Sequence, residues 1–319
     1  MKQVLLFTDL GIDDAFTILY ILFRNDIQLV GIVADYGNVT RDKAMWNINY
    51  LKYITGRHEI PVFLGASIPL TGIGIETFPE VHGEAGLGPI IPPKINYPVY
   101  PLSHIQYMKN IDFNNVTIIN LGRLSSLAIA FILKIEEMEN AKEYICMGGS
   151  FFYPGNVTSV TEANFHSDPY AANLVVQYAK NLTIIPLNVT QNAIVTPEMV
   201  NQIDEFHQIT RDPAGLIIKP MLDYYYNFYS HSNPGIAGSP IHDFLTVWYL
   251  LHPNAVQLSK VPIKVIPDQG DGFGQSIVDL RAKPDPNFKM HSVAFQFNYE
   301  LFKTDIINTF LTIRPNIKG

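Results

Sequence analysis

The stretch LLFTDLGIDDAFTILY, residues 5–20, determines the first unit of the predicted fold. Its apolar start predicts a buried β-strand, and the spacing of the apolar residues that follow predicts a helix over residues 13–24. Between the two, Asp9, Asp13 and Asp14 place three carboxylates within six residues. A strand that turns sharply into a helix is the first half of a βαβ unit. The stretch therefore predicts a parallel sheet with acidic side chains at its carboxyl edge.

The same alternation of short apolar runs and amphipathic runs continues along the chain. Further strand patterns cover residues 27–35, 115–122, 143–149 and 181–189, and further helical patterns cover residues 42–55, 124–138 and 169–180. Strands that take turns with helices are typical of crossover connections. We therefore predict an α/β fold with a mainly parallel open sheet flanked by helices.

The end of the chain has a different pattern. Residues 263–282 and 291–298 read as strands, and residues 301–311 read as a last helix. The glycine-rich stretch GDGFG, residues 270–274, opens no helix, so it favours a hairpin turn over a phosphate-binding loop. We expect a small antiparallel addition here. Because no repeat or low-complexity linker interrupts the pattern, residues 1–319 are predicted to form a single domain.

Composition limits the classes of function. The chain has 319 residues, 47% of them hydrophobic, and a formal net charge of -7. This acidic balance, without a dense stripe of lysine and arginine, argues against a nucleic-acid partner. The sequence contains no apolar stretch of about 18 residues, which is the length that would predict a membrane span. The one cysteine, Cys146, lies in an apolar run and excludes an intramolecular disulfide, so we expect a soluble cytoplasmic protein.

Polar side chains follow the predicted strands where each one ends. They are Asp9 after the first strand, Asn38 after the second, Ser125 after the third, and then Asn156, Glu162 and Asn164. In open α/β sheets, ligands bind beyond the carboxyl ends of the strands. These oxygen-rich positions are therefore the predicted site.

Two interpretations of the acidic stretch are open. Asp13 or Asp14 can cap the helix, where the helix dipole favours a carboxylate. That interpretation leaves Asp9 unexplained, because a third acid adds repulsion unless a cation lies between the three side chains. Several carboxylates without sulfur ligands suit a hard cation, Ca²⁺ or Mg²⁺, better than zinc.

The stretch TDLGIDDA (8–15) resembles the amino-terminal signature of the inosine-uridine type nucleoside hydrolases, and six further motifs resemble those of the same family. They are YGNVT (36–40), VHGEAGLG (81–88), NLGRLSSLA (120–128), MGG (147–149), GNVTSVTEANFHSDPYAA (155–172) and SPIHDFLTV (239–247). They occur in the order of the family and span most of the chain. The resemblance implies one Ca²⁺ per subunit, a ribonucleoside substrate of the inosine, uridine and cytidine class, and hydrolysis of its N-glycosidic bond to ribose and free base. It also implies a homodimer or homotetramer.

The resemblance assigns the metal-binding roles. It implies that Asp9, Asp14 and Asp243 are carboxylate ligands of the calcium and that Ser125 supplies a backbone carbonyl. Asn38 matches a residue beside the attacking water, which the metal activates. Asp9 would take the proton of that water as general base.

The remaining roles concern the substrate. Asp13, Asn156, Glu162 and Asn164 match residues that hold the ribose hydroxyls. His242 and His82 match histidines on the base side, and His242 would protonate the leaving base because histidine has a suitable pKa. Tyr225 and Tyr229 share a helix face at i, i+4 and resemble tyrosines that lie against the base. An aromatic stripe in the core is the alternative interpretation for these two tyrosines.

Five positions depart from the family motifs. Phe7 and Asn188 stand where an aspartate is usual, Leu10 and Arg123 stand for prolines, and Ala163 stands for a phenylalanine. None of the five is a predicted ligand. The loss of an acid at Phe7 and the cation at Arg123 both bear on metal affinity, because neighbours of the ligands tune a metal site.

Two alternatives to the hydrolase remain at this point. One is a protein that binds nucleosides or ribose without turnover. The other is a phosphatase of the haloacid dehalogenase type with Asp9 as nucleophile, because an acid that closes the first strand is also the hallmark of that class. Such enzymes use a DxD pair, and Phe7 replaces the first acid of that pair.

Overall fold

The computed structural model describes residues 1–93, 95, 111–133, 138 and 140–314. Its main sheet has nine strands. In spatial order they are β10 (Ser276–Val278), β9 (Val256–Val265), β11 (Lys289–Phe297), β6 (Leu182–Ile185), β5 (Glu143–Met147), β4 (Val116–Asn120), β1 (Lys2–Thr8), β2 (Ile27–Ala34) and β3 (Val62–Leu64). A separate pair joins β7 (Ile194–Val195) and β8 (Ser239–Pro240).

The strands from β3 to β11 are parallel, whereas β9 pairs antiparallel with both β11 and β10. The prediction of a mainly parallel sheet with an antiparallel addition is confirmed, and the glycine-rich stretch connects β9 to β10 as a hairpin. The order of the strands reverses at β1, which lies between β2 and β4. Such a switch point opens a crevice at the carboxyl edge of the sheet.

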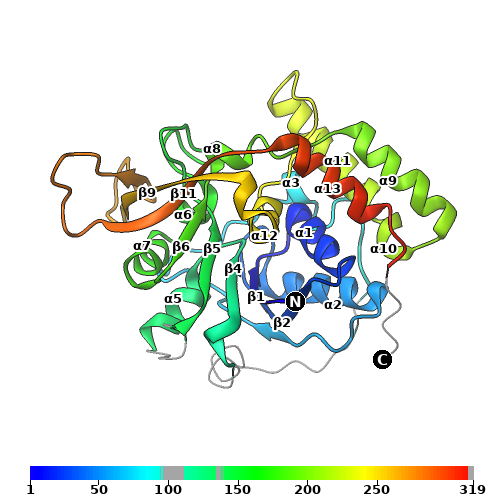
Figure 1. Cartoon of the computed structure of the whole chain (residues 1–319), viewed down its shortest axis with the longest axis horizontal. Helices are drawn as coiled ribbons and strands as arrows, with labels where there is room; N and C mark the ends of the chain where they lie inside the picture. The colour runs from blue at the N-terminus through cyan, green and yellow to red at the C-terminus, as the bar shows by residue number, and fades with distance from the viewer. Residues whose placement is uncertain (94, 96–110, 134–137, 139, 315–319) are drawn as a thin grey trace.

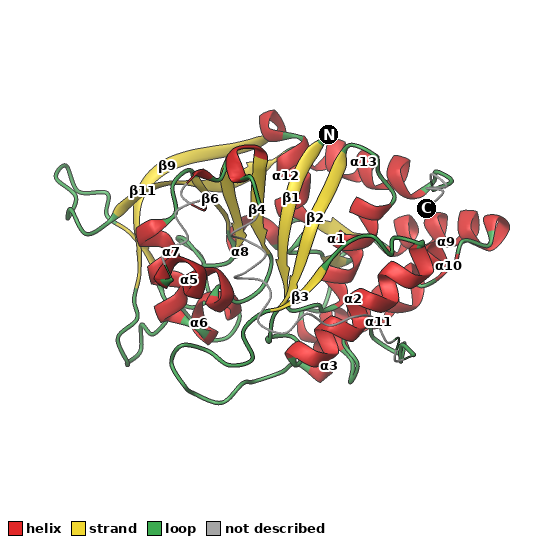
Figure 2. Cartoon of the chain, turned by 90° about the horizontal axis from the view of Figure 1, so that it is seen from below, coloured by secondary structure: helices red, strands yellow, loops and turns green. Residues whose placement is uncertain are grey.

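Helices cover both faces of the sheet (Figure 1). One face carries α5 (Ser125–Ile132) and α7 (Pro169–Tyr178). The other face carries α1 (Ile12–Leu22), α2 (Arg41–Thr55), α9 (Pro197–Thr210), α11 (Ile218–Ser232), α12 (Phe244–Leu251) and α13 (Tyr299–Phe310). Figure 2 shows the two groups of helices on opposite sides of the strands. Short helices complete the chain: α3 (Pro79–His82), α6 (Ala163–Ser167), α8 (Leu187–Thr190) and α10 (Pro213–Leu216).

Strand β1 shows why both faces need cover. Its side chains alternate, with Val4 and Leu6 in the core under α1 and α12 and with Leu5 and Phe7 in the core under α5 and α7. Successive side chains of a strand point to opposite faces, so a strand that is apolar throughout must be buried on both. Phe7 is fully buried in this second core.

Several boundaries differ from the sequence prediction, and two of them have a bearing on the site. The strand pattern over 181–189 ends at Ile185, because Pro186 has no N–H for the ladder, and the short helix α8 follows. The helix predicted over 124–138 ends at Ile132, and residues 134–137 of that prediction lie outside the described residues. Neither change moves a predicted site residue away from the carboxyl edge.

No helix in the described part of the chain combines the length and the apolar character that a membrane crossing requires. The sole cysteine, Cys146, is buried in β5 as a free thiol.

Candidate functional site

The acidic turn after β1 forms as the sequence suggests, with Asp14 in two roles. Gly11 precedes α1, and the Gly11 N–H donates to Oδ2 of Asp14 over 2.8 Å, which caps the helix. The Thr8 hydroxyl donates to the other oxygen, Oδ1, over 2.5 Å. The cap interpretation is therefore confirmed for Asp14, and the same carboxylate also belongs to a buried acidic group.

That acidic group consists of Asp13, Asp14 and Asp243. One oxygen atom from each of the three lies within 4.8 Å of the others, and all three residues are buried. Asp13 and Asp14 come from the start of α1, and Asp243 immediately precedes α12. These two helices pack against the same face of the sheet.

Burial and mutual repulsion make the group costly without a cation. Burial, followed by the charge of Asp9, raises the pKa of Asp13 to about 7. Burial and the neighbouring acids also raise the pKa values of Asp14 and Asp243 well above their usual range. Oδ1 of Asp13 is buried and has no hydrogen-bond partner among the described residues. An all-oxygen donor set with an unpaired carboxylate oxygen fits a hard divalent cation.

Asp9 lies beside this group but faces a different partner. Its Oδ2 atom accepts hydrogen bonds from Nη1 of Arg123 and, over 2.8 Å, from the N–H of Asn38. The Asn38 amide then links the acids, since its Nδ2 atom lies 3.4 Å from Oδ1 of Asp9 and 3.2 Å from Oδ2 of Asp14. Asp9 therefore contacts Asn38 and forms an ion pair with Arg123.

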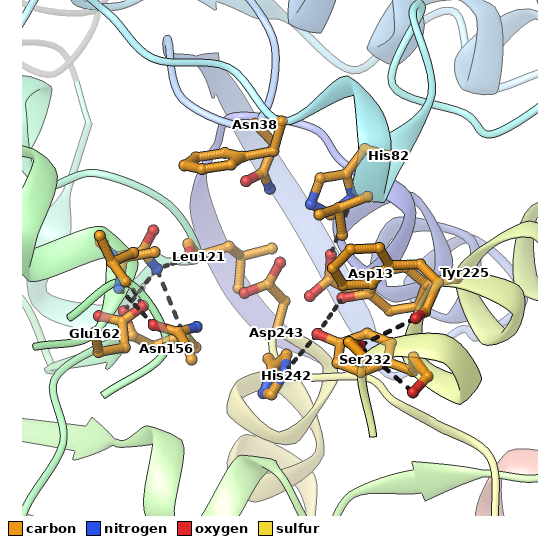
Figure 3. A pocket seen from close by; sticks show the side chains of 18 residues that line it. Asp13, Asn38, His82, Leu121, Asn156, Glu162, Tyr225, Ser232, His242 and Asp243 are labelled. Atoms are coloured by element: carbon orange, nitrogen blue, oxygen red, sulfur yellow. Dashed lines mark hydrogen bonds and ion pairs between the residues drawn. The ribbon is translucent and has the colours of Figure 1, made fainter. Parts of the chain in front are cut away.

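A cavity of about 310 Å³ opens above the acidic group at the carboxyl edge of the sheet (Figure 3). Ten of the predicted site residues line it: Asp13, Asn38, His82, Asn156, Glu162, Asn164, Tyr225, Tyr229, His242 and Asp243. Asp9, Asp14 and Ser125 are not among the lining residues. The volume is at the lower end of the range for small-molecule sites.

The loop after β5 supplies one wall of the cavity, with Asn156 and Glu162 on the same side in Figure 3. Glu162 caps α6, and its carboxylate accepts from the N–H groups of Asn164 over 2.9 Å and Gly149 over 2.8 Å. Its pKa is raised, chiefly by burial. Asn164 donates to the carbonyl of Leu121 over 2.8 Å. Backbone contacts thus hold these polar side chains in fixed positions.

Aromatic rings form the opposite wall. His82 stacks on Tyr225 with ring centroids 5.6 Å apart, and Tyr225 meets Tyr229 edge to face at 4.9 Å. The N–H of Ile12 donates to Nδ1 of His82 over 3.1 Å, and burial lowers the pKa of this histidine to about 3. A neutral ring that accepts at Nδ1 carries its proton on Nε2, so His82 is a hydrogen-bond donor.

His242 completes this wall. Its ring lies between two hydroxyl groups, with Oγ1 of Thr190 2.8 Å from Nδ1 and the Tyr229 hydroxyl 3.1 Å from Nε2. Burial lowers the pKa of His242 to about 4. The ring is therefore neutral at pH 7, with both nitrogens engaged.

Ser125 lies apart from the cavity. It begins α5, and its hydroxyl donates to Asp168 over 2.5 Å and pairs with the Tyr36 hydroxyl over 2.8 Å. This network lies within the described core beside the site. The predicted use of the Ser125 backbone carbonyl as a ligand stays a prediction.

Sequence reasoning missed the apolar residues of the cavity. They are Phe78, Val81, Leu121, Met147, Val157 and Phe228. Val81 begins the motif over residues 81–88 and Phe78 lies just before it, so that motif could have indicated both. Leu121 directly follows β4, and Met147 is the last residue of β5. Both lie at the carboxyl edge of the sheet, where ligands are expected.

The comparisons with known proteins identify the family. The family described as inosine-uridine preferring nucleoside hydrolase matches residues 4–304. An inosine-uridine preferring nucleoside hydrolase of Crithidia fasciculata is 29% identical over 94% of this chain and 95% of its own. A pyrimidine-specific ribonucleoside hydrolase of Escherichia coli is 26% identical over 87% of both chains.

A solved structure is also similar. The purine-preferring ribonucleoside hydrolase from Gardnerella vaginalis aligns with a TM-score of 0.89 and 25% identity, covering 97% of this chain and 98% of the other. The chain belongs to the inosine-uridine preferring nucleoside hydrolase family, as its motifs predicted. It is therefore an enzyme that hydrolyses ribonucleosides, and the phosphatase alternative is set aside.

Proposed function

We propose that this enzyme hydrolyses the N-glycosidic bond of inosine, uridine and cytidine to ribose and free base with the help of one Ca²⁺. The observation that supports this best is the division of the cavity. One side offers carboxylates and amides, which suit a ribose with its hydroxyls, and the other offers aromatic rings and histidines, which suit a planar base. The acidic group lies between these two sides.

The metal ligands proposed are Asp9, Asp14, Asp243 and the backbone carbonyl of Ser125. When bound, a divalent cation would supply the positive charge that acidifies the attacking water and binds the ribose diol. Asp14 and Asp243 already share the acidic group. Asp13 belongs to the same group and lines the cavity, so it is placed to accept a hydrogen bond from a ribose hydroxyl.

Asp9 is the proposed general base. Its Oδ2 atom is held by Arg123 and by the N–H of Asn38, whereas the hydrogen bond that the described residues give Oδ1 is the 3.4 Å contact with the Asn38 amide. Oδ1 is therefore the oxygen that can take a proton from water. Asn38 lines the cavity and is placed to orient that water.

The polar wall is proposed to hold the sugar. Asn156, Glu162 and Asn164 offer amide and carboxylate groups whose positions the backbone contacts fix. Preorganised acceptors of this kind stabilise the positive charge that develops on the ribose ring as the bond to the base breaks.

The aromatic wall is proposed to receive the base. Tyr225 and Tyr229 present ring faces and edges, and His82 donates a hydrogen bond from Nε2. His242 lies within hydrogen-bond distance of the Tyr229 hydroxyl, so a proton can pass along this pair toward the leaving base. Because both histidines are neutral at pH 7, each is expected to relay a proton through its ring and not to carry an extra proton beforehand.

A direct assay tests the proposal. The protein is incubated with inosine, uridine and cytidine, with and without EDTA, and released ribose is measured as reducing sugar. We expect release that EDTA abolishes and that added Ca²⁺ restores. Release that persists in EDTA would contradict the metal requirement, and binding of nucleoside without release would favour the binding-only alternative.

Three broader properties are also proposed. We propose a homodimer or homotetramer, so light scattering should give two or four times 35.9 kDa and not the monomer mass. We propose a single domain over residues 1–319, which predicts one cooperative unfolding transition. We propose a cytoplasmic location, which the unpaired buried thiol of Cys146 supports and which cell fractionation tests.

A further inference from the structure

Arg123 is a buried cation in direct contact with Asp9. Its side chain and that of Asp9 are each 1% exposed and form an ion pair. The same nitrogen, Nη1, lies 3.2 Å from Oδ1 of Asn38 and 3.3 Å from Oδ1 of Asn164. Three side chains that reach the site from separate segments therefore surround one nitrogen atom of Arg123.

The rest of the guanidinium lacks such partners. Nε and Nη2 of Arg123 are buried without a hydrogen bond among the described residues, and the Phe78 ring lies 5.6 Å from the guanidinium carbon. Buried donors without partners are unfavourable. Among the described residues, the ion pair with Asp9 is the charge–charge contact that opposes this cost.

Asp9 is tightly enclosed at this ion pair. A methyl group at Gly37 would lie 1.8 Å from Oδ2 of Asp9 and 2.7 Å from Nη1 of Arg123, and a methyl group at Gly122 would lie 2.5 Å from Oδ1 of Asp9. No side chain fits at either glycine. The carboxylate is thus fixed in a position where one of its oxygens faces the guanidinium.

Two sequence features change the charge at the site in the same direction. Arg123 adds a cation where the family motif has proline, and Phe7 removes an acid where the motif has aspartate. Asp9 is the only one of the four buried acids, with Asp13, Asp14 and Asp243, that has an arginine partner among the described residues.

From these contacts we propose that Arg123 is a positioning residue that neutralises Asp9, and that it thereby weakens divalent cation binding and stabilises the metal-free protein. A guanidinium and a metal ion both carry positive charge toward the same carboxylate, so each lowers the attraction of Asp9 for the other. This inference rests on the metal site proposed above. It concerns how tightly that site binds, not which reaction it catalyses.

The test compares Arg123→Gln with wild type after the metal has been stripped. Glutamine keeps a hydrogen-bond donor and removes the charge. Ca²⁺ is titrated by calorimetry, and thermal unfolding is recorded without metal. We expect Arg123→Gln to bind Ca²⁺ on the order of 10- to 100-fold more tightly, and to melt at a lower temperature without metal.

Arg41→Gln is the matched control. It removes the same charge from a partly exposed arginine that pairs with Asp42. It should bind Ca²⁺ as wild type does. A purely structural role for Arg123 would lower the melting temperature without tightening Ca²⁺ binding, so the affinity distinguishes the two roles.

Equal or weaker Ca²⁺ binding by Arg123→Gln overturns the inference, while ribose release by the wild type would leave the proposed function intact. If neither protein binds Ca²⁺, the inference and the proposed metal site both fail. Binding by the variant alone supports the inference, as does a variant that folds only with Ca²⁺. If Arg123→Gln does not fold at all, Arg123→Lys decides: its shorter reach should tighten binding by a smaller factor, and unchanged binding contradicts the inference.

Discussion

The Tyr229 hydroxyl lies 3.1 Å from Nε2 of His242, so an aromatic side chain of α11 and the residue before Asp243 act as one hydrogen-bonded pair. Because Thr190 occupies the other ring nitrogen, His242 cannot reach a substrate without involving one of its two hydroxyl partners. If His242 delivers a proton as proposed above, Tyr229 is expected to take part in that delivery.

Tyr229→Phe should therefore slow turnover of inosine and uridine by on the order of 100-fold, since general acid catalysis contributes at least that much. p-Nitrophenyl riboside should be affected little, because its leaving group needs no proton. The measurement is kcat on the three substrates. Tyr226→Phe is the control, because its hydroxyl contacts the Ile236 carbonyl instead. Equal losses on all substrates would remove Tyr229 from proton delivery.

Asp243→Asn should separate stability from activity. Removal of one charge from the buried acidic group relieves repulsion, so the metal-free variant should melt at a higher temperature, by about 2–4 °C for each kcal/mol gained. Ribose release should fall by roughly 1000-fold, because a bound metal ion contributes several kcal/mol to such reactions. The exposed Asp268→Asn serves as control. A less stable metal-free variant would argue against repulsion within the group.

The stabilising effect of Ca²⁺ should depend on pH. The folded-state pKa values of Asp13, Asp14 and Asp243 are raised above the usual range. Their contribution to metal-free stability is therefore complete below about pH 4 and is lost as the pH rises through the folded value, about 7 for Asp13. Calorimetry with Ca²⁺ and with EDTA should show a larger Ca²⁺-induced rise in Tm at pH 8 than at pH 5.5. An equal rise at both values contradicts this prediction.

Asp35 offers a second test of buried charge, away from the cavity. Oδ1 of Asp35 accepts from the Ala66 N–H and the Ser126 hydroxyl, but Oδ2 has no hydrogen-bond partner in the described part of the chain. Burial raises the pKa of Asp35 to about 8. Its protonated form favours folding, so the benefit fades between pH 4 and 8, by up to about 1.4 kcal/mol per pH unit. Asp35→Asn should flatten this pH dependence of the unfolding free energy. Urea titrations at pH 5 and pH 8 measure it, and an unchanged slope would count against the assignment.

Much of the site could be predicted because the polar residues follow strands. Asn38, Glu162 and Asn164 come after β2 and β5, and parallel strands bring their carboxyl ends to one edge. The cap at Asp14 is also local, since the contact spans three residues. Such short-range features appear directly in the pattern of the chain.

Other features depend on tertiary structure. Arg123 and Asp9 lie 114 residues apart, and no periodicity indicates that the arginine turns toward the acid instead of solvent. Leu10 adopts a φ of 33°, a conformation that proline cannot take, so its turn differs from the one that the family motif suggests. The packing around the site supports this strained backbone.

The acidic group joins carboxylates that lie more than two hundred residues apart in the sequence. Because Asp243 is synthesised after Asp13 and Asp14, a nascent chain carries an incomplete group until translation passes residue 243. A cation that needs all three carboxylates is therefore expected to bind only after that point. A fragment truncated before Asp243 should show no such binding.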